Sequence, residues 1–198
     1  MWFFVLTLAV HHSWAAVKSD APQTVIKNTV DQALKNPDKL DDAAWVDHLV
    51  DQIFDFERMS KFVLGQNWKK ANAQQQADFV KEFRALLIRT YSTSLKKSIA
   101  AGKTFEVNYL PSAGSKERPK IKTLVKETGK APTAVDYDMY FTAGSWKAYN
   151  VTVEGVSLVT NYQNEFDKDV RTIGMDGLIN KIRNQNQNPQ NNQASDTK

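Results

Sequence analysis

The hydrophobic period of the chain changes near residue 100, and this change restricts the folds open to the sequence. Before that point apolar residues recur at helical spacing, and helical spacing returns after Gly155. In between, apolar and polar residues alternate in four segments, as in strands with one buried face: 103–110, 117–127, 133–143 and 145–155. Short polar turns between these segments favour a four-stranded antiparallel sheet. Helices, then a sheet, then helices predict an α+β fold with helices packed on one sheet face.

The longest predicted helix begins at Asn72, where Asn72 and Gln75 have the spacing of a capping box. Its apolar residues cover an unusually broad arc: Phe79, Phe83, Leu86, Leu87, Tyr91 and Leu95. A helix that is apolar over so wide an arc is covered on more than one side, either by protein or by a ligand.

The first residues of the chain indicate export. The apolar run "WFFVLTLAV" has the length of a signal-peptide core and is too short to span a membrane. Ser13 and Ala15 supply the small residues expected before a cleavage site at Ala16. The usual basic start is missing, and a buried N-terminal strand or helix is the alternative. We expect residues 1–15 to be a signal peptide.

The composition excludes several kinds of site. The 198 residues include no cysteine, which excludes disulfides, thiolate metal ligands and cysteine nucleophiles. Of the three histidines, His11 and His12 lie in the predicted signal peptide, and His48 lies on the polar face of its helix. We therefore expect no metal site and no cofactor.

Two carboxylates offer the best candidate for catalysis. Asp136 and Asp138 lie two apart on one predicted strand, so they share a face. A pair of carboxylates can act as acid and base when its surroundings separate the two pKa values. The alternation of the strand places both opposite its apolar residues, on the solvated side. This placement argues against catalysis. An enzyme that uses Asp136 and Asp138 remains the alternative function, and carboxylates that face inward would favour it.

Basic residues gather between Lys116 and Lys130, where six lysines and arginines stand against Glu117 and Glu127. Such a segment could meet nucleic acid, anionic lipid or an acidic partner. The alternative is a solvated strand whose lysines protect a sheet edge from pairing. Because the chain carries a predicted export signal, we expect no nucleic acid.

Four stretches of sequence, in their order and spacing, closely resemble one family: "FDFERMSKFVLGQNWKKA", "FVKEFRALLIRTYSTSL", "WKAYNVTVEGVSLVTNYQNEF" and "GMDGLINKIR". The chain resembles the MlaC family from about Val25 to Arg183. These are the periplasmic phospholipid-binding components of the Mla lipid-transport system of Gram-negative bacteria, an auxiliary ABC-transporter family linked to toluene tolerance.

The resemblance implies a fold and a function. It implies a curved sheet with helices, similar to nuclear-transport-factor-like folds, together with an N-terminal helical annex. On this reading residues 16–183 form one lipid-binding domain, and the Asn- and Gln-rich residues 184–198 form a disordered polar tail. The expected protein is a periplasmic, monomeric, non-enzymatic shuttle that maintains outer-membrane lipid asymmetry. Its implied partners are an outer-membrane lipoprotein–porin complex and an inner-membrane ABC transporter with a substrate-binding ring.

The resemblance also gives a role to the apolar faces of the long helix and the sheet. Residue patterning leaves two possibilities open, a closed core typical of an interaction or structural protein, and a cavity for an apolar ligand. A phospholipid ligand favours the cavity. We expect its lining to include Leu87, Tyr91, Phe105, Val107, Val135, Tyr137, Met139, Phe141, Val151, Val153, Tyr162 and Phe166.

Overall fold

A computed structural model describes residues 21–188 of the chain, so the predicted signal peptide lies outside the described residues. The helices are α1 (Pro22–Lys35), α2 (Ala43–Ile53), α3 (Phe56–Leu64), α4 (Gln66–Lys70), α5 (Ala73–Ala100) and α6 (Leu158–Gln187), with a 3-10 turn η1 (Pro37–Asp41) after α1. The strands are β1 (Phe105–Tyr109), β2 (Ala113–Gly114), β3 (Pro119–Glu127), β4 (Thr133–Thr142), β5 (Ser145–Val153) and β6 (Val156–Ser157).

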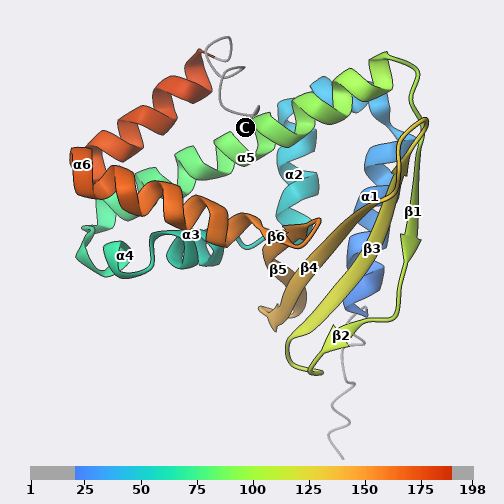
Figure 1. The fold of residues 1–198 in the computed structure, drawn as a ribbon, viewed down its shortest axis with the longest axis horizontal. Coiled ribbons are helices and arrows are strands. Elements are labelled where there is room, and N and C mark those ends of the chain that lie inside the picture. Colours follow the sequence, from blue (N-terminus) through green and yellow to red (C-terminus); the bar gives the residue numbers. More distant parts are fainter. Residues whose placement is uncertain (1–20, 189–198) are drawn as a thin grey trace, which may run out of the picture.

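The predicted α+β fold is confirmed, with the curved, unclosed sheet standing at one end of a group of helices (Figure 1). The strands follow the order β1-β3-β4-β5-β6, and β2 pairs with β3. All pairings between these strands are antiparallel. The four long strands are the four that alternation predicts, while β2 and β6 are two-residue additions at turns.

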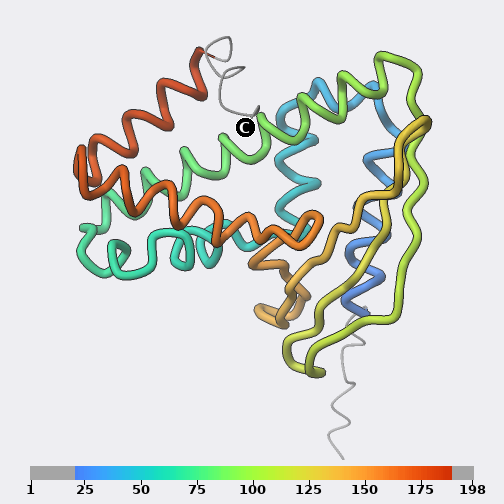
Figure 2. Tube along the Cα trace, viewed as in Figure 1, coloured from blue at the N-terminus to red at the C-terminus, as the bar shows by residue number. Residues whose placement is uncertain are grey.

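Helices form two groups around the sheet. Helix α1 packs against β3 and β5, and α2 reaches β5. Helices α3, α5 and α6 pack mainly against one another, beyond the β5 side of the sheet (Figures 1 and 2). The long helix α5 spans both groups, and it begins with the predicted capping box between Asn72 and Gln75.

The buried side chains divide into two cores in the same way. The helical core joins α3, α5 and α6 through stacked and edge-on aromatic rings, among them Phe79, Phe83 and Phe166. The sheet core joins α1 and the end of α2 to the strands through residues such as Ile26 and Ile121. Phe54, which follows α2, contacts both cores.

The lysines of β3 do not protect an edge, because β3 lies between β1 and β4. Lys120, Lys122 and Lys126 alternate with the apolar residues of β3, and they stand opposite carboxylates of the neighbouring strands. Lys120 forms an ion pair of 2.8 Å with Asp138. The outer sheet face therefore carries cross-strand charge pairs and not an unbalanced basic patch.

The last helix is kinked at Gly174, whose φ of 73° and ψ of 175° interrupt the helical geometry. Both parts of α6 lie where helical spacing returns in the sequence after Gly155. The second part continues to Gln187, so residues 184–187 of the expected tail are helical. Arg183 and Asn186 explain this extension, because both bond the carboxylate of Glu82 on α5, with the Arg183 Nε to Glu82 Oε1 distance at 3.0 Å.

Candidate functional site

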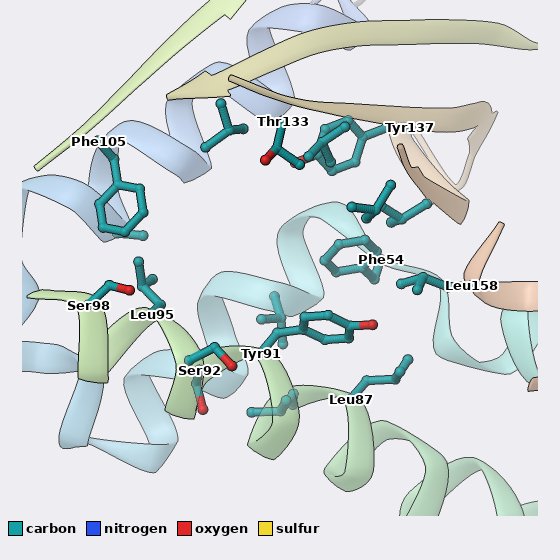
Figure 3. Close-up of a pocket in the computed structure, with 18 of the residues that line it drawn as sticks. Phe54, Leu87, Tyr91, Ser92, Leu95, Ser98, Phe105, Thr133, Tyr137 and Leu158 are labelled. Atoms are coloured by element: carbon teal, nitrogen blue, oxygen red, sulfur yellow. The ribbon is translucent and has the colours of Figure 1, made fainter. Parts of the chain in front are cut away.

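A cavity of about 630 Å³ lies between the inner face of the sheet and helices α2 and α5. This volume is within the range of roughly 300–1,000 Å³ found for small-molecule sites. Side chains from the sheet and from α5 point into the space, as Figure 3 shows for Phe105, Tyr137, Tyr91 and Leu87. The apolar faces of helix and sheet therefore enclose a cavity instead of closing on each other.

Three groups of side chains form the wall. Strands supply Phe105, Val125, Thr133, Val135, Tyr137, Val151 and Val153. Helix α5 supplies Leu87, Ile88, Tyr91, Ser92, Ser94, Leu95 and Ser98. The chain before α5 supplies Ala33, Leu40, Val46, Leu49, Val50, Phe54, Phe56 and Met59, while Leu158 opens α6. Most of this wall is aliphatic or aromatic, so the cavity suits an apolar ligand.

Polar groups lie at one corner of the cavity, where the end of α5 meets the turn between β3 and β4. The Ser98 hydroxyl donates to Glu127 at 3.3 Å, and the Lys130 ammonium pairs with the same carboxylate at 2.9 Å. Lys130 and Ser94 are exposed, and Tyr91 is 45% exposed. The cavity therefore meets solvent along this part of α5.

Tyr137 has a buried polar hydroxyl group on the sheet side of the wall. Burial raises its pKa to about 12, and the nearby Tyr109 phenol adds to the rise. Burial also raises the pKa of Tyr109 to about 12. Both phenols are therefore neutral at physiological pH, and the wall of this region bears no charge.

Seven of the twelve expected lining residues lie on the wall: Leu87, Tyr91, Phe105, Val135, Tyr137, Val151 and Val153. They share a simple origin, since the strand residues follow the alternation of one sheet face and Leu87 and Tyr91 are one turn apart on α5. Val135 faces Val153 across the strands, and Tyr137 faces Val151.

Five expected residues lie elsewhere. Met139 lies on the same face of β4 as Tyr137 but further along the strand, where that face packs in the sheet core with Ile26 of α1 and not on the cavity. Phe141, further along, is 46% exposed against Trp146. Val107 stands opposite Val125 on the outermost long strand but does not reach the cavity.

Tyr162 and Phe166 pack into the helical core and not onto the cavity wall. Both rings contact Phe83 of α5, with centroid distances of 5.3 Å and 5.9 Å. The face of α6 that carries them packs against α5 and α3. Leu158, one turn before Tyr162, is the residue of α6 that lines the cavity.

Sequence reasoning assigned no lining role to α2 or to the segment after it, which supply Val46, Leu49, Val50, Phe54, Phe56 and Met59. A signal for the first three exists in the sequence. They recur at i, i+3 and i+4, so one apolar face of α2 was evident, although not what this face covers.

Asp136 and Asp138 lie on the sheet face away from the cavity, because Val135 and Tyr137 point into it and alternate residues point to opposite faces. Asp138 pairs with Lys120 and accepts a hydrogen bond of 2.8 Å from the Asn150 amide. Within residues 21–188, no group of three histidine or acidic side chains is placed to hold a metal ion.

Comparison with known proteins identifies a family for the part of the chain that forms this fold. The family model described as MlaC protein matches residues 18–184. The chain belongs to the MlaC family. One solved structure is similar to this chain, with 28% sequence identity and a TM-score of 0.72. The match covers 84% of this chain and 97% of the chain in that structure. That structure is a phospholipid-binding protein from Ralstonia solanacearum in complex with a phospholipid.

The family membership confirms the resemblance seen in four stretches of the sequence, and it extends over both groups of helices and the sheet. None of the helices between residues 21 and 188 combines the length and the hydropathy that a membrane span requires. In this MlaC family member the apolar side chains are gathered instead in two cores and around the cavity.

Proposed function

We propose that this protein binds a phospholipid, with the acyl chains in the cavity between α5 and the sheet. The observation that carries the proposal is the cavity itself, about 630 Å³ of mainly apolar wall open to solvent at a polar corner. Support comes from the MlaC family membership and from the Ralstonia solanacearum structure, which contains a phospholipid.

The physical chemistry of the wall suits acyl chains. Each methylene group moved from water into an apolar wall contributes about 0.8 kcal/mol, so long chains supply the binding free energy without a charged clamp. The same term makes release into water slow. Transfer of the lipid therefore requires direct docking on an acceptor, which is the behaviour of a shuttle.

The finer role follows from the family and stays a proposal. We infer a periplasmic, monomeric shuttle that carries phospholipid between an outer-membrane lipoprotein–porin complex and an inner-membrane ABC transporter with its substrate-binding ring. Its task is to maintain outer-membrane lipid asymmetry. An enzyme acting through Asp136 and Asp138 has less support, because both carboxylates lie on the sheet face opposite the cavity.

Location is tested by the N-terminus of the exported protein. We expect sequencing of protein from a periplasmic extract to begin at Ala16, after removal of residues 1–15. A mature protein that begins at Met1, or that stays in the cytoplasmic fraction, contradicts the proposed location.

Lipid binding is tested by purifying the protein from the periplasm without detergent. Native mass spectrometry then gives the mass of the complex, and solvent extraction followed by lipid analysis identifies the bound molecule. We expect a mass increment equal to that of a phospholipid. A protein that is recovered empty and stays empty after incubation with phospholipid vesicles contradicts the proposed function.

A further inference from the structure

The cavity is polarised along its length. Its polar end lies where α5 finishes and the turn between β3 and β4 begins, with Ser98, Glu127 and Lys130 on the wall. Its other end is formed by apolar side chains such as Leu87 and Leu158. Figure 3 shows Ser98 beside Phe105 at one end and Leu158 with Leu87 at the other. A phospholipid bound here matches this gradient only with its headgroup at the Ser98 end.

The two charged residues on the wall at this end, Glu127 and Lys130, differ in exposure. The Glu127 side chain is 15% exposed, whereas the Lys130 side chain is 65% exposed. The carboxylate has two partners, the Lys130 ammonium at 2.9 Å and the Ser98 hydroxyl at 3.3 Å. Lys103 lies outside the turn, with its ammonium beside Gly129. Glu127 is thus a sheltered negative charge, and Lys130 is an exposed cation at the opening.

We propose that Glu127 and Lys130 form a headgroup subsite that selects zwitterionic phospholipids, such as phosphatidylethanolamine, over anionic ones. This proposal rests on the proposed function. Lys130 turns to the phosphate, and the headgroup ammonium takes its place beside the Glu127 carboxylate. Both protein charges stay paired, and two oppositely charged contacts replace the single one present without lipid.

An anionic headgroup cannot complete this exchange. Its phosphate attracts Lys130 but brings no cation for Glu127, so a sheltered carboxylate loses its ionic partner and lies near a second negative charge. Leaving such a group without its partner costs more than the gain from the new contact. Because the pair is partly solvated, we expect a preference of about threefold to tenfold and not an absolute selection.

The simpler account is that the pair only stabilises the turn, since Glu127 and Lys130 are three residues apart. The two accounts predict different behaviour for single substitutions. If the pair only stabilises the turn, Glu127→Gln and Lys130→Gln act in the same direction and leave headgroup selection unchanged. If it forms the subsite, Glu127→Gln lowers the preference for the zwitterion, while Lys130→Gln raises it by leaving the carboxylate in need of a cation.

The experiment loads delipidated protein from vesicles of equimolar dioleoyl phosphatidylethanolamine and dioleoyl phosphatidylglycerol, which have identical acyl chains. The bound lipids are extracted and their ratio is measured. We expect the wild type to favour phosphatidylethanolamine about threefold to tenfold, Glu127→Gln to move the ratio close to one, and Lys130→Gln to increase it. The matched controls are Glu106→Gln and Lys126→Gln, a pair of exposed residues facing each other on the outer sheet face. We expect both controls to retain the wild-type ratio.

The outcomes separate this inference from the proposed function. Total lipid per protein stays constant in all variants, because the acyl chains supply most of the affinity. Wild-type protein that loads both lipids equally, or a Glu127→Gln variant that keeps the wild-type preference, overturns the headgroup subsite alone. Protein that loads neither lipid overturns the proposed function and the subsite with it.

Discussion

Introducing a carboxylate on the cavity wall is the sharpest test of whether this wall binds lipid or belongs to an ordinary core. Val135 lies on β4, lines the cavity and faces Val153 on β5, another wall residue. In Val135→Glu the new side chain points between the acyl chains and the sheet. It has no cation within the apolar part of the wall, since Lys130 belongs to the polar end.

The magnitude follows from the cost of keeping this carboxylate in an apolar site. Burial raises a glutamate pKa by up to about 3–5 units, and each unit corresponds to about 1.4 kcal/mol. The lower figure gives about 4 kcal/mol, or about a thousandfold weaker lipid binding. The empty protein suffers less, because water can hydrate the carboxylate in an open cavity.

The assay measures phospholipid per protein after incubation with vesicles, and circular dichroism verifies the fold. We expect folded Val135→Glu to carry little lipid, and Val153→Glu to behave alike. The matched control is Ala134→Glu, which puts the same charge one residue away on the outer face, diagonal to Lys122 and Lys126. A folded Val135→Glu protein with full lipid occupancy refutes the assignment of this wall.

Two further predictions concern charges outside the cavity. Alanine at both Asp136 and Asp138 leaves lipid binding nearly unchanged, measured by the same loading assay, and a complete loss of function with an intact fold favours the enzyme alternative. Arg183→Ala lowers the free energy of unfolding by about 2 kcal/mol in urea titration, because Glu82 is buried and loses its ionic partner. Arg171→Ala, which removes an exposed ion pair, changes it by less than about 0.5 kcal/mol, and equal effects of the two substitutions contradict the reasoning.

The architecture was predictable because its main signals are local. Alternation of apolar and polar residues marks β1, β3, β4 and β5, and the capping box marks the start of α5. The order of the strands was less accessible. The lysines of β3 suggested an edge strand, but their carboxylate partners stand on β1 and β4, which only pairing in space reveals.

For the site, the sequence predicted which face of each element is apolar, but not which part of that face meets the cavity. On β4 the alternation correctly places Val135, Tyr137 and Met139 on one face, but at Met139 that face packs in the sheet core and not on the cavity. Alternation gives the face on which a strand residue lies, and not what covers that face at each point along the strand. For α6, periodicity identifies Tyr162 and Phe166 as buried but cannot say whether their partner is a ligand or α5.

The most direct measurement of the central claim is the position of the acyl chains. Crystals of the protein loaded with a phospholipid carrying brominated acyl chains give anomalous peaks at the bromine atoms. We predict peaks inside the cavity, between Leu87 of α5 and Val151 and Val153 of β5. Bromine peaks on the outer sheet face or at another surface, with the cavity free of them, contradict the claim that this cavity holds the lipid tails.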